Sequence, residues 1–338
     1  MTHEFKDILE VAQLWQKENR KSVLATVVCL EGSSYRGSGV QMLIGEHGAM
    51  VGAVSGGCVE KEVQRQAESV FTSGIPKVMT YDGRYRLGCE GVLYILLEPL
   101  VVTNELFQAA QTCFANRKVF QSKSYFQPLF SESDSFGTIL EIEGKMYNLR
   151  PSFTVEKESN LEIFKRVFTP LFQLYIFGAE HDAVQLCDLG SKMGWEVHII
   201  ASPDEQKSID YFKGATTLSS PIIQNIDVSA IDHNTAVVIM SHSLTKDLQY
   251  LITLQNTNPS YIGLLGSSKR RERLFSEYMN HASEVSFEFL ERIHGPVGLD
   301  IGAITPIEIA VSIIAEIISV TRNVEVMPLR EKMGRIHG

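Results

Sequence analysis

Strand-like and helix-like segments alternate through the second half of the chain, and this order restricts the fold more than any other feature of the sequence. Apolar and β-branched runs predict strands, and apolar residues at helical spacing predict helices. The strands are expected over 173–177, 196–200, 235–240 and 260–265, and the helices over 180–193, 244–255, 267–281 and 305–320. Strands joined by helices form a parallel sheet that helices cover on both faces. The sequence therefore predicts an α/β fold, a Rossmann-like doubly wound sheet over residues 171–325.

The first half is richer in glycine, and eight of the 25 glycines in the chain lie from Gly32 to Gly57. Glycine-rich turns between short apolar runs are typical of a small β-layer. Helices are expected over 4–18, 58–73 and 104–118, strands over 22–30, 40–44, 49–54, 77–81 and 92–98, and further β-structure over 119–150. We expect an α+β domain over residues 1–150.

The segment from Pro151 to Pro170 is charged and irregular, which predicts a linker over 151–170. A chain of 338 residues is long enough for two domains, each with its own core. We expect residues 326–338 to form a tail.

Composition excludes several classes of function. A net charge of −9 argues against a protein that binds nucleic-acid phosphates. No apolar run approaches the roughly 18 residues of a membrane helix, and the amino terminus lacks the features of a secretory signal. An odd number of scattered cysteines indicates free thiols in a reducing compartment, so we expect a cytoplasmic protein. The five are Cys29, Cys58, Cys89, Cys113 and Cys187. No CxxC pair supports a zinc site.

Cys58 lies in AVSGGCVEKE, where two glycines precede an expected helix. Unpaired amides at a helix amino terminus favour the thiolate, which is the form that attacks or binds metals. Gly56 and Gly57 allow the backbone to approach a ligand closely. The alternative is a small buried residue at a helix start, because free cysteine is often buried. Glu60 could act as an acid or base, although the helix dipole alone explains a glutamate there.

Cys89 has similar surroundings in the segment GCEG, just before the strand VLYILLEP. It can be a second functional thiol or a buried structural one, and the spacing does not show that the two thiols meet. Arginines flank both segments and could hold an anion, although solvated loop arginines are commoner. They are Arg36, Arg84 and Arg86.

The second domain opens with YIFGAEHDAV, in which a strand runs into Gly178 and a helix. A Rossmann unit binds pyrophosphate at this point. Glu180 and Ala183 stand at the second and third glycine positions, and a side chain at the second would obstruct a phosphate. No acidic residue directly follows the next strand, and Asp204 could contact a ribose only with a shifted loop. The sequence therefore weakens the case for NAD(P).

Two later loops also contain candidate binding residues. In GLLGSSKRRERL, Gly266, Ser267 and Ser268 follow a strand and precede a basic helix, so their amides, with Lys269 or Arg270, are candidates for holding an anion. In HGPVGLDIGAITPIEI, the helix start is explained by Thr305 as the cap. The loop before it has more glycines than a connection needs, and its candidate residues are His294, Asp300 and Gly302. A histidine there can equally be an ordinary loop residue.

Five segments, in this order, resemble the xanthine dehydrogenase accessory protein family, XdhC/CoxI. They are AVSGGCVE, GCEGVLYILLEP, YIFGAEHDA, YIGLLGSSKRRERL and HGPVGLDIGAITPIEIAVSIIAEI. The resemblance implies a cysteine-bearing first domain, a Rossmann-like second domain, and a carrier that binds the molybdenum cofactor, Mo-molybdopterin. Cys58 and Cys89 match the cysteine positions of the family's motifs, which implies that both contact the cofactor and its metal.

The resemblance leads us to expect an accessory protein, a carrier more than a turnover enzyme. It would bind the cofactor between its domains, assist its sulfuration and deliver it to a molybdenum hydroxylase such as xanthine dehydrogenase. A cysteine desulfurase is an expected further partner, and the chain is compatible with a homodimer. One alternative is an NAD(P)-dependent oxidoreductase that uses the Rossmann-like domain. Another is a regulatory protein whose second domain only docks a partner.

Overall fold

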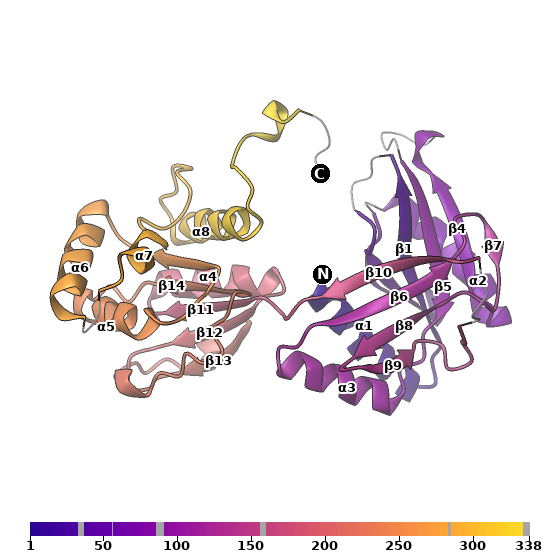
Figure 1. Ribbon diagram of the computed structural model, residues 1–338, viewed down its shortest axis with the longest axis horizontal. Helices are drawn as coiled ribbons and strands as arrows, with labels where there is room; N and C mark the ends of the chain where they lie inside the picture. Colours follow the sequence, from indigo (N-terminus) through magenta and orange to yellow (C-terminus); the bar gives the residue numbers. More distant parts are fainter. Residues whose placement is uncertain (33–36, 56, 86–90, 156–159, 283–284, 334–338) are drawn as a thin grey trace. The chain divides into compact units, whose positions relative to one another are not determined.

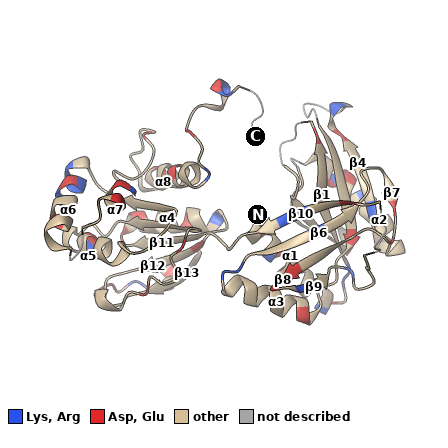
Figure 2. Cartoon of the chain, in the orientation of Figure 1, with Lys and Arg blue, Asp and Glu red and all other residues tan. Residues whose placement is uncertain are grey.

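The computed structural model of the chain describes residues 1–32, 37–55, 57–85, 91–155, 160–282 and 285–333, without the side chains of Cys58 and Tyr85 (Figure 1). The chain divides into two compact units. Met1–Pro170 and the end of the chain from Lys332 form the first unit, and Leu171–Glu331 form the second. Within the described ranges, no helix has the length and apolar character needed to cross a membrane. Acidic and basic positions are interspersed in both units (Figure 2).

The described part of the first unit contains three α-helices and two antiparallel sheets. The helices are α1 (Thr2–Lys17), α2 (Cys58–Ser73) and α3 (Asn104–Ala115). The first sheet has the order β3-β2-β1-β5-β4-β7, with β1 (Ser22–Glu31), β2 (Gln41–Gly45), β3 (Met50–Gly52), β4 (Lys77–Asp82), β5 (Val92–Pro99) and β7 (Ser131–Glu132). The second has the order β10-β6-β8-β9, with β6 (Phe120–Phe126), β8 (Gly137–Ile142), β9 (Lys145–Asn148) and β10 (Glu162–Phe168).

The two faces of the first sheet pack against different layers. Successive side chains of a strand point to opposite faces, so Ile95 and Leu97 of β5 join the core beneath α2. Leu96 lies between them in sequence and packs with Phe126 and Phe136 of the second sheet region. The first unit therefore has a helix layer, a sheet and a second sheet in succession.

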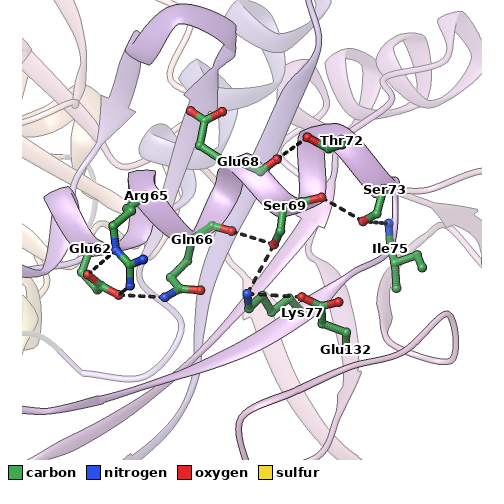
Figure 3. Close-up of polar contacts among 10 residues, drawn as sticks. All are labelled: Glu62, Arg65, Gln66, Glu68, Ser69, Thr72, Ser73, Ile75, Lys77 and Glu132. Atoms are coloured by element: carbon green, nitrogen blue, oxygen red, sulfur yellow. Dashed lines mark hydrogen bonds and ion pairs between the residues drawn. The ribbon is translucent and has the colours of Figure 1, made fainter.

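Helix α2 forms where the apolar spacing predicts it. Val59, Val63 and Val70 are buried against the first sheet, and Gly74, with φ 73°, ends the helix in the left-handed region. On its polar side, the helix is tied to the strands by Lys77 of β4. The Nζ atom of Lys77 lies 3.3 Å from Oγ of Ser69 and 3.2 Å from Oε1 of Glu132 (Figure 3).

The structure corrects the predicted linker over 151–170. Residues 162–168 of that segment are β10, which pairs antiparallel with β6 from Glu162↔Phe126 to Phe168↔Phe120. The segment EIFKRVF alternates with period two, but its charged residues hide this pattern because they stand on both faces. Phe168 stacks on Phe120 with ring centroids 4.5 Å apart, and Arg166 donates hydrogen bonds to the carbonyl of Gly39 and to Oε1 of Gln41. These contacts make β10 part of the first unit.

The second unit is a parallel sheet of order β13-β12-β11-β14-β15-β16. Its strands are β11 (Gln173–Phe177), β12 (Glu196–Ile200), β13 (Ala215–Ser219), β14 (Thr235–Ile239), β15 (Tyr261–Leu264) and β16 (Ile293–His294). Its helices are α4 (His181–Lys192), α5 (Leu244–Leu254), α6 (Ser268–His281), α7 (Phe287–Glu291) and α8 (Pro306–Thr321).

Helices cover both faces of this sheet, as the sequence predicts. Ile176 of β11 packs with residues of α4 and α8, whereas its neighbour Phe177 packs with residues of α5 and α6. The predicted α/β fold is therefore confirmed, with an α+β first unit and a Rossmann-like parallel sheet in the second, and the structure shows that the sheets of the first unit are antiparallel. The sequence patterns did not predict β13, β16 or α7, which have five residues or fewer.

Candidate functional site

The second unit has a topological switch point between β11 and β14. The chain moves outward from β11 to β12 and β13, returns to β14 beside β11, and continues outward to β15 and β16. In open α/β sheets, ligands bind outside the carboxyl ends of the strands at such a point. We call the three loops that follow β11, β14 and β15 the carboxyl-edge loops, residues 178–180, 240–243 and 265–267.

Gly178 is required by the approach of the neighbouring loop. Its φ is 142°, and a Cβ atom added there would lie 2.5 Å from the carbonyl oxygen of Met240. This contact explains the first glycine of the fingerprint without a ligand. Glu180, at the second position, is the exposed residue that precedes α4, and Ala183, at the third, is buried against the sheet.

The start of α4 is acidic. Glu180 and Asp182 place two carboxylates where a Rossmann fold seats a pyrophosphate. Asp204, after β12, is already engaged, because its carboxylate accepts hydrogen bonds from Oγ of Ser202 and, at 3.3 Å, from Nζ of Lys246. These bonds lower the pKa of Asp204. Both features disfavour a dinucleotide in the usual orientation.

The loop before α6 brings together the residues predicted from GLLGSSKRRERL. Gly266 has φ 137°, and an added Cβ would lie 2.4 Å from Cδ of Arg270. Oγ of Ser267 accepts a hydrogen bond from the amide of Arg270, and Ser268 begins the helix. The guanidinium of Arg270 binds Asp247 of α5, with Nη2 2.7 Å from Oδ2. Arg270 is therefore paired within the unit, whereas Lys269 is exposed.

The loop after β14 holds residues that none of the sequence motifs marked. The buried carboxylate of Asp247 accepts hydrogen bonds from the amide of Ser241, at 3.3 Å, and from its hydroxyl. His242 has φ 57°, and its Nε2 lies 3.4 Å from Oδ2 of Asp182. The segment SHS belongs to none of the sequence motifs described above. The feature that could have singled it out is a histidine between two serines, after a strand and before a helix.

His294 is held by Glu316 of α8. The carboxylate of Glu316 lies 3.5 Å from Nδ1 of His294 and accepts hydrogen bonds from the hydroxyl of Tyr261 and the amide of Gly298. Burial alone raises the pKa of Glu316, but these hydrogen bonds lower it below its usual value. His294 also stacks on Tyr261, so these contacts explain its place without a ligand.

Asp300 and Gly302 lie farther along the loop from β16 to α8. Asp300 is exposed, and Gly302 has φ 73° with open space where a Cβ atom would be. Their loop begins at the carboxyl end of β16, at the same edge of the sheet as the carboxyl-edge loops.

The candidate site of the first unit is the amino terminus of α2. The helix begins at Cys58, as predicted, and Gly57 before it is exposed with φ 115°. The carboxylate of Glu60 accepts hydrogen bonds from the amide of Ser55 at 2.6 Å and the amide of Gly57 at 2.7 Å. Glu60 is buried and holds this loop in place. Two amide groups of the loop are therefore already hydrogen-bonded to its carboxylate. Gly56 and Cys89 lie outside the described residues.

The thiols that the structure describes are poorly suited to act as nucleophiles or metal ligands. Burial raises the pKa of Cys29 and Cys113, and it raises the pKa of Cys187 to about 11. A thiol must be deprotonated to attack or to bind a metal. Where side chains are described, no group of three or more His, Cys, Asp or Glu residues is arranged to hold a metal ion.

Fold and motifs together define a two-unit protein with a Rossmann-type second unit and a glycine- and cysteine-bearing first unit. Residues 174–317 match the model of the XdhC Rossmann domain, and residues 15–82 match that of the XdhC and CoxI family. The chain belongs to the XdhC and CoxI family.

Two curated proteins are similar along most of their length. A Bacillus subtilis (strain 168) protein, named as a probable subunit of xanthine dehydrogenase, is 28% identical over 92% of this chain and 96% of its own. An Escherichia coli (strain K12) protein named molybdenum cofactor insertion chaperone PaoD is 26% identical over 96% of this chain and 91% of its own. A Bacillus halodurans crystal structure described as a xanthine dehydrogenase matches with a TM-score of 0.76 and 26% identity, over 94% of this chain and 96% of that one.

Proposed function

We propose that this protein binds the molybdenum cofactor and assists its sulfuration and insertion into a xanthine dehydrogenase-type hydroxylase. One observation carries the proposal. The similarity to the protein named a molybdenum cofactor insertion chaperone covers 96% of this chain, and so includes both units. The cofactor is then cargo, and the protein acts as a carrier without turnover of its own.

The first unit would supply the groups that contact the metal. Thiolate sulfur is a soft ligand that suits a metal already bound by a dithiolene. Cys58 begins α2, where the helix dipole favours a thiolate. The carboxylate of Glu60 accepts hydrogen bonds from the amides of Ser55 and Gly57, which precede the helix. We assign Cys58 and Cys89 to the cofactor on this basis and on the family resemblance.

The second unit would hold the phosphate. Backbone amides lie at the amino terminus of α6, in the segment Gly266, Ser267 and Ser268, and Lys269 adds an exposed positive charge. This end is favoured over the start of α4, where Glu180 repels an anion. Gly178 and the loop of Asp300 and Gly302 lie along the same edge of the sheet and complete the proposed binding residues.

The partners follow from this role. A molybdenum hydroxylase such as xanthine dehydrogenase would receive the cofactor, and a cysteine desulfurase would supply the sulfur. We propose that the protein works in the cytoplasm and that it forms a homodimer. Light scattering of the purified protein tests the dimer, which a mass of a single 338-residue chain would exclude.

The decisive experiment measures cofactor loading. The protein is incubated with a cofactor-producing extract under anaerobic conditions and repurified, and molybdenum and released pterin are quantified. We expect about one of each per chain, and less for Cys58→Ser and Cys89→Ser. Cys113→Ser is the matched control, because its thiol is buried in α3 and donates to a backbone carbonyl that a serine can also reach.

Two results would contradict different parts of the proposal. If the repurified wild-type protein contains no pterin, the carrier function is refuted. Unchanged loading of both Cys58→Ser and Cys89→Ser would refute the role of the thiols but leave the carrier in place.

An NAD(P)-dependent oxidoreductase is the second candidate. It is favoured by the strand order of the second unit and by Gly178 and Ala183 at two fingerprint positions. The exposed carboxylate of Glu180 and the engaged carboxylate of Asp204 disfavour it. A rise in melting temperature with NADH, and none with molybdopterin, would favour the oxidoreductase.

A further inference from the structure

The loop after β14 holds a histidine in a conformation that non-glycine residues rarely adopt. His242 has φ 57°, in the left-handed region. The neighbouring Ser241 is fastened by its amide and its hydroxyl to the buried carboxylate of Asp247. Asp247 is in turn held by Arg270 of α6. Two helices therefore fix the backbone on which the imidazole stands.

The imidazole of His242 is oriented from a third element. Its Nε2 lies 3.4 Å from Oδ2 of Asp182, in the first turn of α4, and its side chain is 53% exposed. A carboxylate beside Nε2 favours the tautomer that carries its proton there. The other nitrogen, Nδ1, is then a hydrogen-bond acceptor, and the described residues provide it with no partner.

These contacts join the ends of the elements around the switch point. Asp182 follows β11, His242 follows β14, and Arg270 follows β15. Ligands of open α/β sheets bind at this edge. A residue that is half exposed, held from three helices and left with one acceptor atom is suited to contact a ligand.

We propose that His242 binds the heterocycle of the cofactor by accepting a hydrogen bond at Nδ1 from an N–H group. Asp182 is a positioning residue that sets the tautomer. The inference rests on the proposed function and adds the binding residue. The partner must be a donor, because Nδ1 accepts and the carboxylate of Asp182 beside the imidazole is an acceptor as well. An amino-pyrimidinone ring such as the pterin offers amine and lactam N–H donors, whereas a phosphate at neutral pH offers mainly acceptors.

The test measures molybdopterin affinity of the full chain under anaerobic conditions. We expect His242→Ala to raise the Kd about tenfold, which corresponds to about one hydrogen bond. His242→Asn should recover most of the affinity, because asparagine tolerates the left-handed conformation and can place an acceptor oxygen near the position of Nδ1. His233→Ala is the matched control, since His233 is exposed and lies before β14 rather than after it.

A second measurement tests the geometry itself. Nitrogen-15 NMR of the imidazoles in the ligand-free protein should show the proton of neutral His242 on Nε2, and Asp182→Asn should move population toward the Nδ1–H tautomer. If Asp182 and His242 form a purely structural pair, Asp182→Asn will change the tautomer population without changing the Kd for molybdopterin. The NMR and affinity measurements therefore separate a structural role from a role in binding.

Each outcome decides a different claim. If wild-type protein does not bind molybdopterin, the proposed function and this inference both fail. If it binds and His242→Ala binds equally well, only this inference is overturned. A tenfold loss of affinity seen with NADH but not with molybdopterin would overturn the pterin contact. A proton found on Nδ1 in the ligand-free wild type would overturn the acceptor assignment.

Discussion

Glu98 of β5 joins the two sheets of the first unit through Thr138 of β8. One carboxylate oxygen accepts the backbone N–H of Thr138 at 2.9 Å, and the other forms a hydrogen bond with its hydroxyl. Glu98 is completely buried. Burial raises its pKa to about 7, against the opposing effects of the Thr138 hydrogen bonds and the charge of Arg150. The carboxyl group therefore takes up a proton in the folded protein well above the pH at which it does so in the unfolded chain.

The first unit should lose stability as the pH rises from about 4.5 to about 7. In this window the folded state binds the proton of Glu98 and the unfolded state has released it, so the free energy of unfolding falls with rising pH and levels off above pH 7. The loss amounts to up to about 3 kcal/mol. Glu98→Gln should remove this slope and be more stable than wild type at pH 8, because a neutral amide can donate and accept in the same place.

Urea unfolding at pH 5 and pH 8 checks this prediction. The chain has two tryptophans, so in a Trp195→Phe background the fluorescence of Trp15 reports on the first unit alone. Glu68→Gln, an exposed carboxylate on α2, is the control and should keep the slope of wild type. An equal slope in the Glu98→Gln variant would contradict the assignment.

Replacing Arg270 should destabilise the second unit by about 3 kcal/mol, because the buried carboxylate of Asp247 would lose its cation. Arg270→Met keeps most of the apolar stem and removes only the charge. Combining it with Asp247→Asn should recover part of the loss, since no charge is then left unpaired. Lys269→Met, on the exposed side of the same turn, should change stability by less than about 0.5 kcal/mol.

Urea unfolding followed through Trp195 in a Trp15→Phe background measures both Arg270 variants. A double variant less stable than Arg270→Met alone would show that Asp247 stabilises the loop of Ser241 independently of the arginine.

Local patterns in the sequence predicted most of the fold. The spacing of Val59, Val63 and Val70 predicted α2, and the apolar runs of β11 and β14 predicted two central strands of the parallel sheet. Such segments are determined by their own periodicity. The strand β10 was missed because Lys165 and Arg166 stand on opposite faces, so that charge conceals the alternation, and the strand is fixed by aromatic stacking on β6.

The candidate site was less predictable because its contacts join segments that are distant in sequence. Gly178 was singled out as a cofactor-binding residue, and the close approach of the carbonyl of Met240 requires a glycine there with or without a ligand. Lys269 or Arg270 was a candidate for holding an anion, and the structure pairs Arg270 with Asp247, which no local pattern marks. His242 depends on Asp182, sixty positions earlier in the chain. Only the packing of α4, α5 and α6 around one sheet edge brings these residues together.

Alanine at Gly178 should be far more costly than alanine at Gly302. Both glycines have positive φ, but a Cβ atom at Gly178 meets backbone at 2.5 Å and one at Gly302 meets open space. We expect losses of about 3 kcal/mol for Gly178→Ala and about 1 kcal/mol for Gly302→Ala. Thermal unfolding of the two variants compares them directly. Similar losses would mean that the loop of Met240 moves aside without cost, and that Gly178 is not fixed by it.

The thiols should differ in their reactivity toward iodoacetamide. Cys187 is fully buried, and burial raises its pKa to about 11, while Cys113 is buried in α3 with a raised pKa. Both should stay unmodified in the native protein at pH 7.5, because alkylation requires an accessible thiolate. Cys58 should be modified faster, since the amino terminus of α2 favours its thiolate, and we expect the same of Cys89 from its assignment to the cofactor.

Mass spectrometry of tryptic peptides after timed alkylation measures all five thiols in one sample. Glu60→Gln is an informative companion variant, because it removes the negative charge beside the loop of Gly57 while keeping an acceptor for one amide. The loss of that charge should make Cys58 react faster without changing Cys113 or Cys187. If Cys58 reacts no faster than Cys187 in either protein, its thiol is sealed from solvent, and a direct contact with a bound metal is excluded.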